Sequence, residues 1–214
     1  MLNRARLGFE EMTKEDIDLL LSRCVEGTTV EHGYLHAYYS NADVANYNMQ
    51  MLNKLEKPLY QIKGTIKAPL GLMSRVRNSI KEDGRVGGTG FLDVLNIKVG
   101  ARVTLIYNVW TSDGLVNGAM GTIVGICRNK QNSIVDYIAV AFDNERAGTN
   151  QRLKYQYYAD RYSKVNGTPI FKHEMEFDLS KRTTSSAKGT IHQFPLMLAW
   201  ASTAHRLQVT FCII

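Results

Sequence analysis

The hydrophobic period of this 214-residue chain changes near Gly100, and the change separates two kinds of structure. Before that point, apolar residues recur mainly at helical spacing. After it they alternate with polar residues, first around Val103 and Leu105 and again over 171–179. A period of two is typical of half-buried strands. Several short strands joined by polar turns within about 80 residues predict a small β-barrel.

Two helices are expected in the first part of the chain. Thr13 can cap the first, with Asp16 three residues later in a capping-box arrangement. Its apolar stripe consists of Ile17, Leu20, Leu21 and Cys24, and Gly27 ends it. The aromatic run 34–39 is typical of a strand, and Ser40 or Asn41 can cap the helix that follows. The stripe of this second helix consists of Val44, Tyr47, Met51 and Leu55.

The stretch Pro195–Ala201 is continuously apolar near the other end of the chain. Such a run is typical of a strand buried on both faces of a parallel sheet, and a buried helix is the alternative. The order of patterns is therefore α/β, then a small barrel, then α/β again, with the barrel as an insertion. The glycine-rich segment 84–90 does not follow a strand and has no Gly-Lys-Ser/Thr after it, so we expect a flexible surface loop there, not a phosphate cradle.

Composition excludes several classes of protein. With 44% apolar and 21% charged residues, the chain is neither a disordered tail nor a coiled coil. No apolar run approaches 18 residues, and the first residues lack a secretory signal, so we expect an intracellular protein with no membrane partner. Three widely spaced cysteines without a CxxC pair argue against a disulfide framework or a cysteine zinc site.

Positive charge is concentrated in two blocks. Residues 54–102 hold ten Lys and Arg against four Asp and Glu, and residues 146–182 hold eight against four, within a net charge of +6. The second block also carries Tyr155, Tyr157, Tyr158 and Tyr162, and Trp110 in an earlier polar loop is a further candidate to stack a base. Basic surface with aromatics suits a polyanion whose bases stack. The alternative is that these charges only solubilise loops.

Three segments resemble one family, in the same order. They are HAYYSNADVANYNMQML (36–52), LNIKVGARVTLIYNVWTSDGLVNGAMGTIVGI (95–126) and FPLMLAWASTAHRLQ (194–208). Together they resemble the C-terminal half of a superfamily-one 5′-to-3′ DNA helicase of the petite-integration-frequency (Pif-type) family, including versions carried by Helitron-like mobile elements. The resemblance implies an α/β fold: a partial RecA-like second motor domain with an inserted small Src-homology-type β-barrel. Its start and a basic linker would occupy 1–95, the barrel 96–180, and a truncated return to the motor domain 181–214.

The resemblance also implies which residues face single-stranded DNA. The matching positions are Ser40, Asn41, Thr203, His205, Arg206 and Gln208. The last four match a Thr-x-His-Lys/Arg-x-Gln-Gly motif that links the strand to the nucleotide cleft. Independently, a polar loop leaving a buried strand displays N–H groups and a hydroxyl that suit a phosphate oxygen. The alternative is a capped helix start with His205 packed against Trp200.

Departures from the family limit the expected activity. No G-x-x-x-x-G-K-S/T occurs, the acidic metal-binding motif is absent, and the chain stops at Ile214 before the family's arginine motif. Val209 stands where the family has glycine, so the preceding motif is expected to be poorly placed.

We therefore expect no catalytic or metal-binding residues, with ATP and Mg²⁺ bound only in the full-length context. The expected partners are single-stranded DNA and the missing N-terminal motor domain, in DNA repair, recombination or telomere maintenance, and the nucleus is favoured over the mitochondrion. The alternatives are a non-catalytic single-stranded nucleic-acid-binding module and an inactive mobile-element relic.

Overall fold

The computed structural model of the protein describes residues 12–22, 35–129, 131, 134–179 and 187–203. The chain divides into two compact units, residues 1–34 and 35–214. The first unit contributes helix α2 (Lys14–Leu21). The Thr13 N–H donates to the Asp16 carboxylate over 3.1 Å, and the Asp16 N–H donates to the Thr13 hydroxyl over 3.3 Å, so the predicted capping box is confirmed. Cys24 and Gly27, expected at the end of this helix, lie outside the described residues.

In the second unit, helix α3 (Asn41–Lys54) follows strand β1 (His36–Tyr38), as predicted. Ser40 is the N-cap, because its Oγ accepts the Asp43 N–H over 3.1 Å. The predicted apolar stripe of this helix is displaced, since the residues buried on α3 are Asn48 and Leu52. Because Asn48 is polar, the hydrophobic pattern did not identify the face of the helix that is buried.

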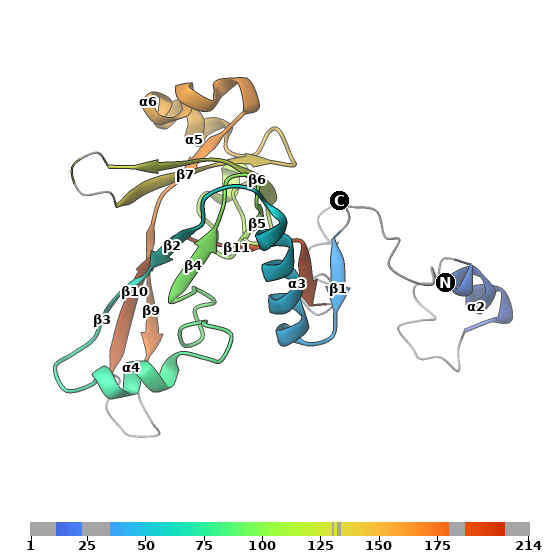
Figure 1. The fold of residues 1–214 in the computed structure, drawn as a ribbon, viewed down its shortest axis with the longest axis horizontal. Coiled ribbons are helices and arrows are strands. Elements are labelled where there is room, and N and C mark those ends of the chain that lie inside the picture. The colour runs from blue at the N-terminus through green and yellow to red at the C-terminus, as the bar shows by residue number, and fades with distance from the viewer. Residues whose placement is uncertain (1–11, 23–34, 130, 132–133, 180–186, 204–214) are drawn as a thin grey trace. The chain divides into compact units, whose positions relative to one another are not determined.

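Asn48 joins α3 to the C-terminal part of the described chain. Its Nδ2 donates to the carbonyls of Leu198 and Ala201 over 3.4 and 3.1 Å, and its Oδ1 accepts the N–H groups of Trp200 and Ala201, each over 2.9 Å. These bonds fix the turn that leads into strand β12 (Ala201–Thr203), which pairs in parallel with β1. Figure 1 shows α3 running beside this two-stranded sheet.

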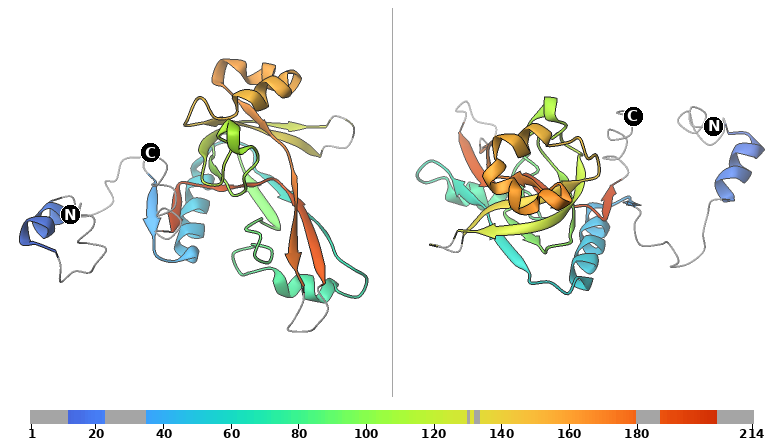
Figure 2. Two further views of the ribbon diagram at one scale, coloured as in Figure 1. Left: turned by 180° about the vertical axis from the view of Figure 1, so that it is seen from behind. Right: turned by 90° about the horizontal axis from the view of Figure 1, so that it is seen from above.

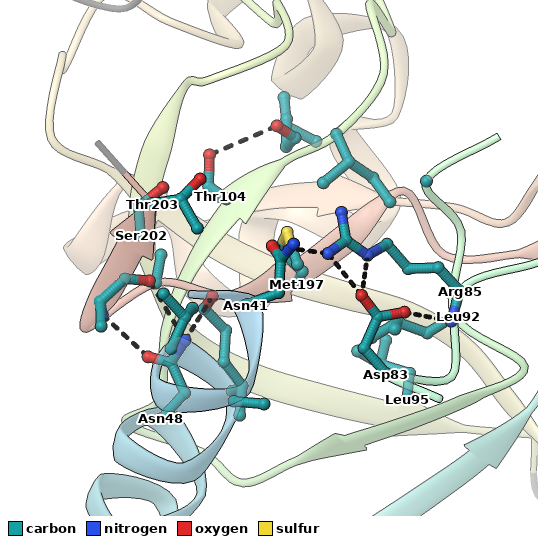
Figure 3. A pocket seen from close by; sticks show the side chains of 18 of the residues that line it. Asn41, Asn48, Asp83, Arg85, Leu92, Leu95, Thr104, Met197, Ser202 and Thr203 are labelled. Atoms are coloured by element: carbon teal, nitrogen blue, oxygen red, sulfur yellow. Dashed lines mark hydrogen bonds and ion pairs between the residues drawn. The ribbon is translucent and has the colours of Figure 1, made fainter. Parts of the chain in front are cut away.

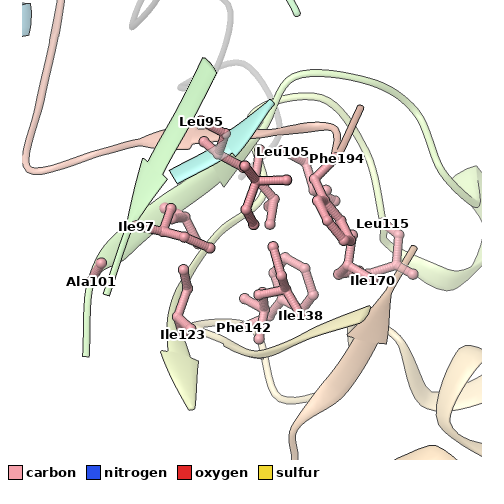
Figure 4. Packing of buried hydrophobic residues seen from close by; sticks show 14 of the residues in the cluster. Leu95, Ile97, Ala101, Leu105, Leu115, Ile123, Ile138, Phe142, Ile170 and Phe194 are labelled. Atoms are coloured by element: carbon pink, nitrogen blue, oxygen red, sulfur yellow. The ribbon is translucent and has the colours of Figure 1, made fainter. Parts of the chain in front are cut away.

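A five-stranded antiparallel sheet forms the centre of the second unit, with the order β11-β5-β6-β7-β8. Its strands are β5 (Arg102–Leu105), β6 (Met120–Arg128), β7 (Val135–Phe142), β8 (Thr168–Ile170) and β11 (Leu196–Leu198). The largest apolar cluster packs against it (Figure 4) and includes Leu95, Ile97, Leu105, Ile123, Ile138, Ile170 and Phe194. The predicted alternation around Val103 and Leu105 therefore marks a real strand, β5.

The small β-barrel expected over 96–180 is not closed among the described residues. Strands β11 and β8 are the two edges of the sheet and are not paired with each other. Strand β8 has only three residues, and its middle residue is Pro169, which has no N–H to donate to a further strand. The edge strand β11 also comes from residues 196–198, beyond the range expected for the barrel.

A second group of strands extends from the central sheet (Figures 1 and 2). Strands β3 (Thr65–Lys67), β10 (Lys188–Gln193) and β9 (His173–Asp178) form one antiparallel sheet, and β2 (Tyr60–Lys63) pairs with β4 (Val94–Ile97). Helix α4 (Met73–Ser79) belongs to this region. Its separate apolar cluster consists of Val76, Val86, Phe91, Phe177, Leu179 and Ile191.

Two further expectations are corrected by these contacts. The segment 84–90 is a packed turn and not a flexible surface loop, because Val86 is fully buried and bridges to Ile80. The apolar run 195–201 is not one strand of a parallel sheet. It supplies β11, which is antiparallel to β5, and then the start of β12, which is parallel to β1. Apolarity on both faces reports burial but not strand direction.

Short helices complete the described chain. They are η2 (Thr111–Asp113), α5 (Thr149–Lys154), α6 (Gln156–Ala159) and η3 (Asp160–Val165). Figures 1 and 2 show α5 and α6 near β7, at the end of the unit opposite α4. Among the residues that the structure describes, no helix is both long and apolar enough to span a bilayer.

We predict that Asn48→Ala lowers the free energy of unfolding by about 2–4 kcal/mol, because it leaves the N–H groups of Trp200 and Ala201 without their acceptor. Asn46→Ala, an exposed asparagine on the same helix, should change it by no more than about 0.5 kcal/mol. Urea unfolding of both variants measures the difference. Equal effects of the two substitutions would show that the buried amide is not a structural link.

Candidate nucleic-acid interface

A pocket of about 690 Å³ opens in the second unit, where the start of α3, strand β4, the segment 82–92 and the turn around β12 meet. Figure 3 shows Ser202 and Thr203 on one side of it and Asp83 and Arg85 on the other, with Asn41 between them in that view. Segments from four distant parts of the sequence therefore contribute polar side chains to one concave surface.

The topology of the parallel pair explains why the polar residues meet there. Strand β1 ends just before Ser40, and β12 ends at Thr203, in the register Tyr38↔Thr203. The carboxyl ends of parallel strands lie at the same edge, which is where α/β proteins bind ligands. Helix α3 also begins at this edge, and the first N–H groups of a helix attract anions.

Asn41 is held in a defined orientation by Arg85. The guanidinium Nη2 donates to Asn41 Oδ1 over 2.8 Å. Because a guanidinium has no acceptor, the amide must turn its oxygen towards Arg85, which leaves Nδ2 as the donor on the other side. Asn41 is exposed, so this donor is accessible to a ligand in the pocket.

Arg85 is in turn held by Asp83. Its Nε donates to Asp83 Oδ2 over 2.7 Å, and its Nη2 lies 2.5 Å from the same oxygen. Burial acts to raise the pKa of Asp83, but the hydrogen bonds and the positive charge of Arg85 outweigh it, so the pKa of this carboxyl lies below its usual value. Asp83 therefore neutralises Arg85 and fixes its direction.

The pocket offers hydrogen bonds more than positive charge. Its ionisable lining residues are Glu82, Asp83 and Arg85. Neutral donors come from Asn41 and from the hydroxyls of Ser202 and Thr203, while Asn96 Oδ1 is a buried acceptor with no partner among the described residues. A phosphate oxygen here would be bound by neutral donors, which grip a backbone without reading sequence.

The structure describes three of the six expected site residues, and two of these line the pocket. Asn41 and Thr203 line the pocket, whereas Ser40 does not; the Ser40 hydroxyl donates to the Asp43 carboxylate over 2.6 Å as part of the helix cap. The remaining positions, His205, Arg206 and Gln208, lie outside the described residues, as does Val209.

Sequence reasoning missed the contribution of the segment 82–92. Asp83 and Arg85 belong to the basic stretch before Gly100, and the glycine-rich segment 84–90 that contains Arg85 was expected to be a surface loop; Asn96 lies in a segment of the family resemblance but was not marked as a site residue. The charge excess of residues 54–102 was the only available signal. Within the described ranges, no three His, Cys, Asp or Glu side chains are placed to hold a metal ion.

Comparison with known proteins adds a family relationship to this geometry. Residues 91–126 match the model of the DNA helicase Pif1 2B domain. This segment of the chain is related to the 2B domain of Pif1 helicases. The chain is 27% identical over 168 residues to the ATP-dependent DNA helicase Pif1 of Campylobacter jejuni. The aligned region covers 78% of this chain and 32% of that protein. The chain thus corresponds to about a third of the length of this Pif1 relative.

Solved Pif1 structures share the fold. Bacteroides sp. Pif1 in complex with ADP-AlF4 gives a TM-score of 0.57 at 22% identity, over 92% of this chain and 37% of that one. Bacteroides Pif1 bound to single-stranded DNA gives the same TM-score at 21% identity, over 93% and 37%. Pif1 from Candida albicans gives 0.54 at 16% identity, over 92% and 41%. The mixed α/β architecture described above is therefore part of the Pif1 fold.

The Asp83–Arg85 pair predicts acid sensitivity. Because the pKa of Asp83 is lowered in the folded protein, its stabilisation is complete above the unfolded pKa and is lost as the pH falls through the folded one. The stability difference between the natural chain and Asp83→Asn should therefore shrink from about pH 5 to about pH 2. Urea unfolding across that range measures it. In an Arg85→Gln background the same comparison should vary less with pH, and an undiminished variation there would contradict the assignment to this pair.

Proposed function

We propose that the chain is the DNA-contacting part of the second RecA-like motor domain of an ATP-dependent 5′-to-3′ DNA helicase of the Pif type. The observation that carries the proposal is the parallel β1–β12 pair, which brings Asn41, Ser202 and Thr203 to one pocket in a chain related to the Pif1 2B region. Residues 1–95 would form the start of that domain and a linker, 96–180 a Src-homology-type insertion, and 181–214 the return.

The residues of the pocket would hold the strand by its backbone. Asn41 Nδ2 and the hydroxyl of Thr203 would donate to phosphate oxygens, and Arg85 would keep the Asn41 amide in its donating orientation. Such contacts do not distinguish bases, so binding should be independent of sequence. The structure of Bacteroides Pif1 bound to single-stranded DNA supports this choice of ligand.

Hydrolysis of ATP would require the rest of the enzyme. The phosphate loop and its Mg²⁺-binding hydroxyl would come from an N-terminal motor domain, which is the proposed protein partner, so ATP and Mg²⁺ would bind only in the full-length context. The assembled helicase would act in DNA repair, recombination or telomere maintenance, inside the cell and in the nucleus more than the mitochondrion.

A second candidate is a non-catalytic module that binds single-stranded nucleic acid. It is favoured by the basic and aromatic block 146–182 together with the lack of a Gly-Lys-Ser/Thr sequence in the 214 residues. An in-frame Gly-Lys-Ser/Thr loop upstream of Met1 in the gene would favour the helicase. An intact messenger without one would favour the module, and a disrupted gene would favour an inactive relic.

We predict that Asn41→Ala and Thr203→Val each weaken the binding of a labelled oligo-dT strand several-fold, as expected for the loss of one hydrogen bond to a charged group. Asn41→Asp should weaken it more, because it keeps an acceptor for Arg85 but replaces the donor by a negative charge. Asn46→Ala is the matched control on the same helix. Anisotropy titrations at two salt concentrations measure the affinities. Unchanged binding in all three pocket variants would exclude this pocket as the DNA contact.

The purified chain is expected not to hydrolyse ATP, with or without single-stranded DNA, because phosphoryl transfer needs the positioned charges of a phosphate loop. Phosphate release in the presence of oligo-dT is the measurement. DNA-stimulated release that is lost in Thr203→Val would contradict the expectation.

A further inference from the structure

A second pocket, of about 410 Å³, shares no lining residue with the first. It lies between the loop after β5, the junction of α5 and α6, and the start of β9. Its walls combine three aromatic side chains with two lysines, and its lining residues are Val109, Trp110, Gln151, Lys154, Tyr155, Phe171, Lys172 and His173. Lys154, Tyr155, Phe171 and Lys172 of block 146–182 thus line one concave site together with Trp110.

The aromatic side chains form a connected series that leads from the pocket to solvent. Tyr155 and Phe171 have ring centroids 4.7 Å apart, and Tyr158 lies 5.6 Å from Phe171. Tyr157 follows at 5.3 Å from Tyr158 and is 87% exposed. Trp110 is half-buried and is fixed in place because its Nε1–H donates to the Ser112 hydroxyl over 2.9 Å. Held rings of this kind are suited to stack flat ligands.

The two lysines of the pocket have no counter-charge among the residues that the structure describes. Lys154 Nζ lies 5.6 Å from the Trp110 ring centroid and 5.3 Å from that of Tyr155, and Lys172 Nζ lies 5.6 Å from that of Phe194. In the described part of the chain, neither ammonium group has a carboxylate or a hydrogen-bond acceptor. Burial lowers the pKa of Lys172, because its charged form loses solvation there. An anion bound between the two lysines would supply the missing counter-charge.

We infer that this pocket binds one nucleotide of a single strand, with its phosphate between Lys154 and Lys172 and its base against Trp110 or Tyr155. The choice follows from the pairing of an anion site with aromatic walls, since a nucleotide presents a phosphate and a flat ring within one residue. The inference rests on the proposed function in that the ligand is again single-stranded DNA, but it uses a separate set of residues. A free mononucleotide carries the same chemistry, and the experiment distinguishes the two.

The fluorescence of Trp110 can report the binding of a ligand in the second pocket. The chain has two tryptophans, so in Trp200→Phe the fluorescence comes from Trp110 alone. Oligo-dT should quench this fluorescence in a saturable way, because a base stacks on the indole. A strand of the same length with abasic sites throughout should bind with little quenching. Equal quenching by both strands, or none by either, would overturn the inference.

The charge requirement is tested with a matched pair of variants. Lys154→Gln/Lys172→Gln should weaken oligo-dT binding at least about fivefold and lower the slope of log affinity against log salt by about 0.7, the contribution of the single phosphate that the two lysines would hold. Lys63→Gln/Lys67→Gln removes the same charge from exposed positions that line neither pocket. Its effect on the slope should be much smaller. Equal effects of the two pairs would show that only net charge matters and would overturn the inference.

Further measurements distinguish a strand from a free nucleotide as the ligand, and distinguish failure of the first pocket from failure of the second. Quenching that saturates with dTMP at concentrations as low as with oligo-dT would point to a free nucleotide and overturn the strand assignment, as would tighter binding of a phosphotyrosine peptide. If Asn41→Ala weakens binding while Trp110 stays unquenched, the second pocket fails and the first stands. If Trp110 is quenched normally while Asn41→Ala and Thr203→Val have no effect, the first pocket fails and the second stands.

Discussion

The amide of Asn48 is the interaction on which the candidate site depends. A buried amide is costly unless its donors and acceptor are paired, and Asn48 pairs both ends with the backbone around residues 198–201. Strand β12 has only three residues and one partner, β1, so its own ladder gives it little stability. Because Asn41 is on the same helix and Thr203 is on that strand, the distance between the two polar groups follows from Asn48.

The alternation of apolar and polar residues predicted strands but not their connections. Strands β5 and β9 were readable because apolar and polar residues alternate along them, and β6 and β7 because they are rich in β-branched and aromatic residues between polar turns. The alternation did not predict that the central sheet would stay open. One edge is β8, in which Pro169 has no N–H to donate, and the other edge is β11, which comes from residues 196–198. Strand direction is likewise absent from a continuously apolar run.

The motif residues of the site were found through a family resemblance, and the residues that orient them were not. Arg85 and Asn41 are 44 positions apart in the sequence, and no local spacing of residues predicts a contact over that sequence separation. Such pairings exist only once the segment 82–92 packs through Val86 and Phe91. The result is a division between the two pockets: neutral donors held by an internal ion pair in the first, and uncompensated ammonium groups beside aromatic rings in the second.

The link from Asn48 to Ala201 spans 153 positions, and this has a consequence for how the protein is made. Closing so long a loop costs entropy that nearby contacts do not repay, so the β1–β12 pair belongs to the slow, late part of folding. During synthesis, α3 leaves the ribosome long before its partner exists. Until residue 201 emerges, water must satisfy the amide that the helix will later bury. The edge formed by β1 and β12 can therefore be completed only after residues 201–203 have left the ribosome.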